Sequence, residues 1–166
     1  MSSLTAHFAQ PCSHETSLST EQADAIIAQA LALLEQRIFA TGPKISGLKA
    51  VADYLRLQLI HEPSEVFAAV FLTTRHQVIA IETLFRGTID SSEVHPRVVV
   101  QRAMAHNAAA VIVAHQHPSG HAQPSAADLI LTKDLRCALQ MLDVRLLDHF
   151  VIGKGTPFSL AKRGLL

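Results

Sequence analysis

A short apolar segment followed by two histidines constrains the fold of this chain more than any other feature. Residues 111–114, Val-Ile-Val-Ala, are apolar and mostly β-branched, which is typical of a buried strand. His115 and His117 follow where that strand is expected to end. Side chains two residues apart in an extended chain point to the same side. We therefore expect both imidazoles to face one side and Gln116 to face the other.

A helix is predicted soon after the histidines, with a carboxylate in its first turn. Residues 118–120, Pro-Ser-Gly, break the strand, and residues 124–125, Pro-Ser, open a helical pattern. Asp128 lies in the first turn, far enough from His117 for the loop to fold back toward the histidines. Two histidines and one carboxylate leave a fourth position open, which is the composition of a catalytic zinc site. The predicted metal ligands are His115, His117 and Asp128.

Helix capping is a simpler interpretation of the same residues. Ser125 and Asp128 fit the pattern Ser-x-x-acid, in which the serine is the N-cap and the acid complements the helix dipole. The two histidines could be ordinary loop residues, because the chain contains 10. Their joint spacing with Asp128 favours the metal site.

The remaining pattern predicts an α/β fold in which a mixed β-sheet is sandwiched by helices, in α-β-α layers with N-terminal helices. Apolar stripes on the two N-terminal helices indicate core or dimer surface, so a homodimer is a further expectation. Residues 85–92 are predicted to form a loop. Helices are expected from Ser19 to about Ile38, from Ser46 to about Ile60, over 95–107 and over 125–142, and strands over 66–72, 78–81, 111–114, 146–152 and 157–160.

A length of 166 residues suits one main domain with an appendage. We expect a flexible tail over 1–18, a helix and connector over 19–44, and the main domain over 45–166.

The formal net charge is zero, with 14 basic and 14 acidic residues, which argues against a strongly electrostatic nucleic-acid binder. Two cysteines suggest no disulfide framework. Without the pattern of a signal peptide or membrane span, a soluble, cytoplasmic protein is expected.

The spacing His-x-His, seven residues, Ser, two residues, Asp, with an upstream glutamate before a strand, resembles the JAMM motif of the MPN+/JAB metalloproteases. The flanking residues are similar to the bacterial RadC-type JAB proteins, and the short length is similar to their prophage- and plasmid-borne members. The resemblance covers about residues 42–166 and implies a JAB/MPN, cytidine-deaminase-like fold. The segments that carry it are 65–67, 84–88, 94–97, 114–120, 124–125 and 148–149.

The resemblance implies a zinc centre and a role for each residue of the motif. His115, His117 and Asp128 would ligate Zn²⁺, with water in the fourth place. Zinc lowers the pKa of bound water to about 7. Glu65 would accept the proton of that water and deliver it to the leaving amine. Ser125 would donate a hydrogen bond to the oxyanion of the tetrahedral intermediate.

Three functions compete at this point. The first is zinc-dependent hydrolysis of a peptide or isopeptide bond, with Glu82 and Glu93 as alternatives to Glu65 for the general base. The second is a non-catalytic accessory in DNA repair or DNA metabolism, as the RadC name suggests, and the balanced charge weakens it. The third is a non-haem iron oxygenase with a two-histidine, one-carboxylate triad. The ligand spacing differs from that expected for the third, and no 2-oxoglutarate-binding arginine is identifiable.

Overall fold

The computed structural model describes residues 18–39, 48–87 and 94–166. Most of the predicted tail, the connector after the first helix, and Glu93 lie outside these ranges. The described elements follow the predicted order of two helices, two strands, a helix, a strand, a helix and two strands. A short 3-10 helix over Ala161–Arg163 comes last.

Five strands form one mixed sheet, as predicted. In chain order they are β1 (Val66–Leu72), β2 (Val78–Arg86), β3 (Ala110–Gln116), β4 (Arg145–Ile152) and β5 (Phe158–Ser159). Their order across the sheet is β2-β1-β3-β4-β5. The β3–β4 pair is parallel, and the other neighbouring strands are antiparallel. The strand with the histidines is therefore the central one.

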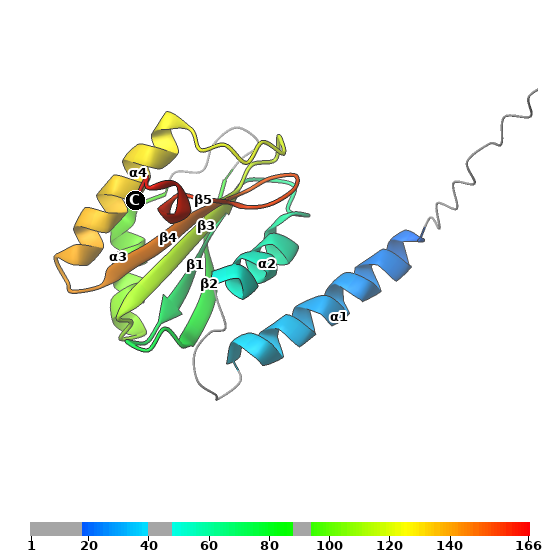
Figure 1. The fold of residues 1–166 in the computed structure, drawn as a ribbon, viewed down its shortest axis with the longest axis horizontal. Coiled ribbons are helices and arrows are strands. Elements are labelled where there is room, and N and C mark those ends of the chain that lie inside the picture. Colours follow the sequence, from blue (N-terminus) through cyan, green and yellow to red (C-terminus); the bar gives the residue numbers. More distant parts are fainter. Residues whose placement is uncertain (1–17, 40–47, 88–93) are drawn as a thin grey trace, which may run out of the picture.

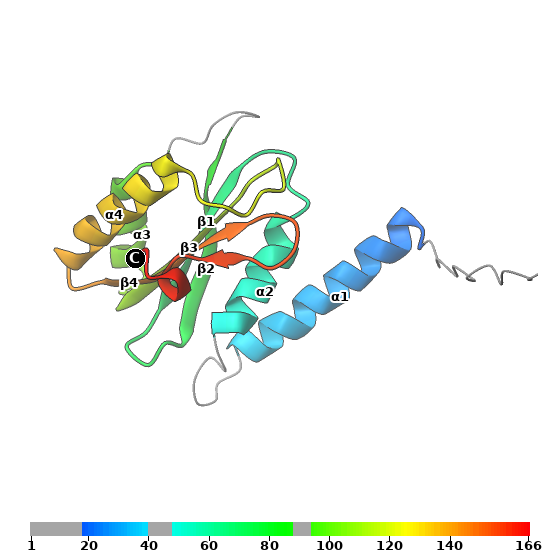
Figure 2. The ribbon, with the colours of Figure 1, turned by 45° about the horizontal axis from the view of Figure 1, so that its top comes forward.

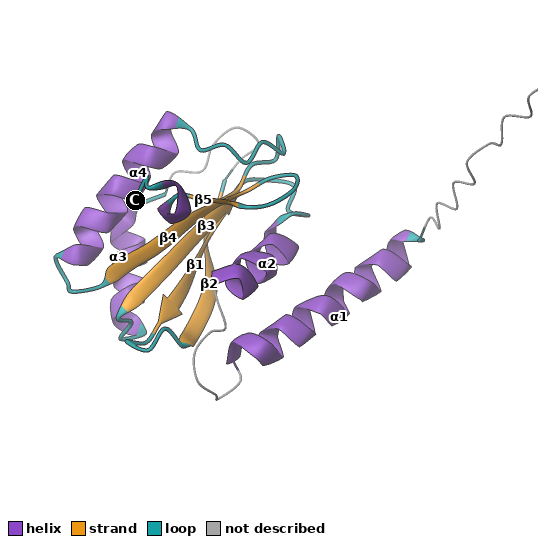
Figure 3. Ribbon diagram, in the orientation of Figure 1, coloured by secondary structure: helices purple, strands orange, loops and turns teal. Residues whose placement is uncertain are grey.

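Helices cover both faces of this sheet, which confirms the predicted α-β-α layers (Figures 1 and 3). The helices are α1 (Thr20–Phe39), α2 (Leu48–Leu59), α3 (Pro96–Ala105) and α4 (Ala126–Gln140). Helices α3 and α4 cover one face and α2 covers the other, while α1 extends along the outer side of α2 (Figure 2). No helix in the described ranges is long and apolar enough to cross a lipid bilayer.

The core consists of two apolar clusters, one on each face of the sheet. Leu55 of α2 packs in the cluster that contains Val70 and Ile112, and Leu135 of α4 packs in the one that contains Val113. Every residue of β1 and β3 is buried. Strands covered on both faces need apolar side chains at successive positions, which explains their uninterrupted apolar sequences.

Several strand boundaries differ from the predictions because strand pairing extends or shortens the elements. β3 continues through His115 and Gln116, which pair with β1 and β4. Phe85–Arg86, assigned to a loop by the sequence, belong to β2 and pair with the start of β1. The last strand covers only Phe158–Ser159, rather than 157–160. An isolated segment carries no information about such partners.

An ion pair joins β2 to α3 through Glu82. Arg102 donates through Nε to Glu82 Oε2 at 2.7 Å, and the Nε2 atom of His106 lies 2.7 Å from Oε1. Hydrogen bonding from Arg102 is the main reason that the pKa of Glu82 falls from 4.5 to about 2. A carboxylate with a lowered pKa stabilises the fold above its unfolded-state pKa, and this stabilisation is lost as pH falls through the folded-state value.

We predict that Glu82→Gln lowers the free energy of unfolding at neutral pH by about 1 kcal/mol or less, because Arg102 is partly exposed. The difference from wild type should shrink as pH falls from about 4.5 toward about 2. Urea unfolding at a series of pH values measures this. Asp53→Asn is the control, because it removes a more exposed pair with Lys49 within α2. A difference that stays constant across this pH range would contradict the prediction.

Candidate metal centre

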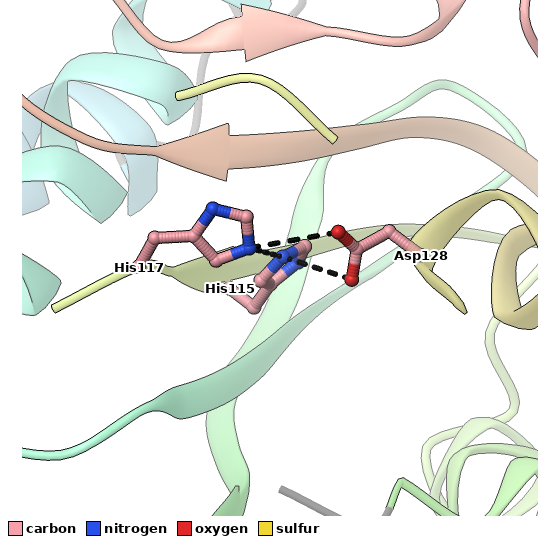
Figure 4. Close-up of side chains that lie close together, drawn as sticks. All are labelled: His115, His117 and Asp128. Atoms are coloured by element: carbon pink, nitrogen blue, oxygen red, sulfur yellow. Dashed lines mark hydrogen bonds and ion pairs between the residues drawn. The ribbon is translucent and has the colours of Figure 1, made fainter. Parts of the chain in front are cut away.

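The three predicted ligands lie together where β3 ends and α4 begins (Figure 4). One ligand atom from each of His115, His117 and Asp128 lies within 4.8 Å of the others. The two histidine Nε2 atoms are 2.9 Å apart. Asp128 Oδ1 is 3.2 Å from His115 Nε2, and Oδ2 is 3.5 Å from His117 Nε2. Both imidazoles therefore present Nε2 to the same carboxylate.

Alternation along β3 puts the histidines on the face covered by α3 and α4. His115 pairs with Phe67 of β1, and their rings stack with centroids 6.4 Å apart. Gln116 points to the opposite face, where its Nε2 donates to main-chain oxygens at 2.8 and 2.6 Å. The side chain of His115 is 1% exposed and that of His117 is 20% exposed. Solvent therefore reaches the cluster from the side of His117.

The loop between the histidines and α4 packs closely against the end of β4. Gly120 N donates to His117 O at 2.8 Å, and Lys154 N donates to Gly120 O at 2.8 Å. A Cβ atom at Gly153 would lie 2.6 Å from Gly120 O and 2.7 Å from Ala122 N. Such contacts are too short for any side chain, so glycine at position 153 permits this path of the loop.

A main-chain hydrogen bond orients His117. Its Nδ1 lies 2.8 Å from the carbonyl oxygen of His121. A carbonyl oxygen only accepts, so we assign the hydrogen to Nδ1, and Nε2 faces Asp128. A hydrogen bond with Asp128 raises the pKa of His117 above 6.5 and outweighs the opposing effect of burial. The negative charge of Glu65 acts in the same direction.

Asp128 caps its own helix and also faces the histidines, so both interpretations of the sequence describe real contacts. Ser125 is the N-cap of α4, and the main-chain N of Ser125 donates to Asp128 Oδ2 at 2.6 Å. The Ser125 hydroxyl donates to the same oxygen at 2.7 Å. Burial alone would raise the pKa of Asp128, but its contacts with His115 and His117 hold it well below its usual range. The carboxylate is therefore ionised and held in one orientation.

The three candidate general bases have different surroundings. Glu65 directly precedes β1, and its main-chain oxygen accepts from Gly87 N at 2.8 Å. The pairing of β1 with β3 ends at Phe67 and His115, two residues from Glu65 and from His117, and the charge of Glu65 raises the pKa of His117. Glu82 is instead held by Arg102 and His106 (see above), while Glu93 lies outside the described residues.

Two further polar residues belong to the site, although sequence reasoning gave them no defined role. His149 of β4 contacts His115, with its Nε2 atom 2.8 Å from His115 Nδ1. Thr132 of α4 contacts His149 in turn, with its Oγ1 atom 2.6 Å from His149 Nδ1. Burial lowers the pKa of His149 to about 3, so this imidazole is neutral at physiological pH. The sequence indicated only that residues 148–149 are among the segments that resemble the RadC-type JAB proteins. A histidine within an apolar strand was the available signal, but its neighbour depends on strand order.

Comparison with known proteins relates the whole region of the site to one family. The family model described as the RadC-like JAB domain matches residues 45–165. A UPF0758 protein of Azotobacter vinelandii is 53% identical over 124 residues, which are 75% of this chain and 55% of that protein. A UPF0758 protein of Halorhodospira halophila is 59% identical over 125 residues, 75% of this chain and 56% of that protein. The chain thus spans about half the length of the curated relatives it matches.

The raised pKa of His117 predicts that protons and metal compete for its Nε2. Zn²⁺ affinity should fall as pH decreases through this raised pKa, by about tenfold per pH unit for each proton displaced. The loss should begin above pH 6.5, the ordinary value for histidine. Titration calorimetry in buffers with different ionisation enthalpies measures both the affinity and the protons released.

The control for this experiment is His121→Ala. His121 contacts His117 through its main-chain oxygen, so removal of its side chain should leave both the affinity and its pH dependence unchanged. His117→Ala should bind Zn²⁺ more weakly and release fewer protons. Wild-type affinity that is constant from alkaline pH down to pH 5 would contradict the prediction.

Proposed function

The chain belongs to the RadC-like JAB domain family, and from this premise we propose that it is a zinc-dependent hydrolase of peptide or isopeptide bonds. The observation that carries the proposal is the convergence of His115, His117 and Asp128 within 4.8 Å. Two neutral imidazole nitrogens and a carboxylate are the ligand set of catalytic zinc sites with one open position.

The distances among the ligand atoms support zinc. With bonds of about 2.0–2.1 Å, ligand atoms at the corners of a tetrahedron around zinc are about 3.3 Å apart. Here the two Nε2 atoms are 2.9 Å apart and Asp128 Oδ1 is 3.2 Å from His115 Nε2, while the other carboxylate oxygen, Oδ2, is 3.5 Å from His117 Nε2. Asp128 can hold the metal without losing its helix cap, because the main-chain N of Ser125 bonds Oδ2 and leaves Oδ1 free of that contact.

Glu65 is the proposed general base and acid. When bound, zinc lowers the pKa of a water molecule to about 7 and supplies hydroxide near neutral pH. Glu65 directly precedes β1, and its negative charge acts on His117. It accepts the proton of the attacking water and transfers it to the nitrogen of the leaving amine.

Ser125 is the proposed donor to the oxyanion of the substrate. Its side chain is exposed at the start of α4, beside Asp128. The hydroxyl hydrogen now points to Asp128 Oδ2, so rotation about the Cβ–Oγ bond is needed to direct it to a substrate carbonyl. Asp128 keeps its orientation during that rotation, because the main-chain N of Ser125 still donates to the same oxygen at 2.6 Å.

A pocket of about 230 Å³, which Gln116 also lines, meets the site at His117 and supports binding of an extended peptide. His117 is shared between this pocket and the metal cluster, and Lys154 and Glu62 provide charge at its wall. The volume suits one side chain of a substrate rather than a folded partner. The remaining lining residues include Ile60, Pro63, Pro118 and Ile152.

Metal content is the first test of the proposal. Untagged wild-type protein should contain about one zinc per chain by mass spectrometry, as expected for one site. A His115→Ala/His117→Ala double variant should contain none, because both imidazole ligands are removed. Iron in place of zinc would favour the oxygenase. Failure of the wild type to bind zinc even after incubation with it would rule out the hydrolase.

Glu65→Gln tests the reaction itself. With a proteome-derived peptide library as substrate and mass spectrometry as readout, this variant should cleave about 10²- to 10⁴-fold more slowly than wild type, with its zinc content unchanged. Glu82→Gln is the matched control, because Glu82 is paired with Arg102 and should be dispensable for cleavage near neutral pH. A larger loss in Glu82→Gln than in Glu65→Gln would reverse the assignment of the base.

A further inference from the structure

The Nδ1 atom of His115, which faces away from His117 and Asp128, contacts a buried side chain. His115 Nδ1 is 2.8 Å from His149 Nε2, and His149 Nδ1 is 2.6 Å from Thr132 Oγ1. Thr132 Oγ1 is in turn 2.6 Å from the main-chain oxygen of Asp128. The contacts thus run from one proposed ligand to the backbone of another. His115 and His149 are each at most 1% exposed, and Thr132 is 2% exposed.

We propose that Thr132 and His149 form a directed hydrogen-bond chain that fixes His115 in the tautomer with Nδ1 protonated and Nε2 free for the metal. This inference rests on the metal-binding part of the proposed function. It makes Thr132 and His149 positioning residues, because neither touches the cluster of Nε2 and carboxylate atoms.

The direction of this hydrogen-bond chain follows from its last hydrogen bond, between Thr132 and the main-chain oxygen of Asp128. A carbonyl oxygen and a hydroxyl oxygen 2.6 Å apart require a hydrogen between them, and only the hydroxyl of Thr132 has one to donate. Its Oγ1 must then accept from His149, so the hydrogen of His149 is on Nδ1. A neutral imidazole carries one N–H, which leaves His149 Nε2 as an acceptor. His115 must therefore donate from Nδ1, and its own Nε2 bears a lone pair.

Burial explains why His115 needs such a chain while His117 does not. His117 is nearer the surface and bonds a loop carbonyl, that of His121, directly. His115 lies inside β3, where the carbonyl groups are committed to the sheet, so a side chain must supply the acceptor. His149 occupies the neighbouring parallel strand, where it pairs with Val113. The rings of Phe67 and His149 are steeply inclined to each other, at 69°, with their centroids 5.9 Å apart.

The hydrogen-bond chain also connects β3 and α4, the two elements beside which the proposed ligands lie. It begins on β3 at His115 and ends on α4 at the carbonyl of Asp128, one helical turn before Thr132. A change in the separation of β3 and α4 would lengthen at least one of the hydrogen bonds. Residues that orient a ligating histidine affect metal affinity, typically by 10- to 100-fold.

The test compares Thr132→Val, which removes the hydroxyl at nearly constant volume, with Thr132→Ser, which keeps it. Zinc affinity is measured by competition with a chromophoric chelator, and the histidine tautomers by long-range ¹H–¹⁵N NMR of the metal-free proteins at mildly alkaline pH. Thr132→Ser should retain the wild-type affinity and a His115 signal with Nδ1 protonated. Thr132→Val should bind zinc about 10-fold more weakly and lose the single His115 tautomer.

The outcomes separate this inference from the proposed function. A wild type that binds no zinc contradicts the proposed function, while the metal-free NMR spectrum still tests the chain. Equal zinc affinity and unchanged tautomers in wild type and Thr132→Val overturn the inference and leave the hydrolase intact. If Thr132→Val does not fold, the wild-type spectrum decides, because a His115 signal with Nε2 protonated overturns the inference.

Discussion

The pairing of β3 with β1 on one side and β4 on the other is the interaction on which the rest of the structure depends. All seven residues of β3 are buried, so its register is fixed by the apolar side chains that must face each helical layer. A shift by one residue would turn His115 toward α2 and bring Gln116 to the candidate metal site. Packing of apolar residues such as Val111 and Val113 therefore determines the position of the site.

The central strands also bury polar groups, and hydrogen bonds compensate for most of them. Asp148, on the α2 face of β4, accepts from the Ser159 hydroxyl at 2.6 Å and from Ala161 N at 3.0 Å. These bonds hold β5 and the final 3-10 helix against the sheet. Gln116 Oε1 is the one buried side-chain oxygen or nitrogen without a partner in the described ranges. Such an atom costs about 1–3 kcal/mol, and the two bonds from Gln116 Nε2 offset part of it.

Asp128 is one side chain that both caps a helix and faces the candidate metal site. An N-terminal cap stabilises a helix by about 1 kcal/mol, and here the reciprocal bonds between Ser125 and Asp128 also fix the carboxylate rotamer. The same rotamer directs Oδ1 toward His115. A carboxylate held by the start of a helix loses little freedom on binding a metal. Helix capping and metal binding are therefore compatible at this residue.

The sequence alone predicted the order of the elements, the α-β-α layers and the candidate metal ligands His115, His117 and Asp128, because periodicity and spacing are local properties. It could not choose among three glutamates. Only the tertiary structure brings the charge of Glu65 close enough to act on His117 and commits Glu82 to Arg102, because both placements depend on which strands and helices become neighbours. The role inferred for His149 depends on tertiary structure in the same way, since β4 lies beside β3 only in the folded sheet.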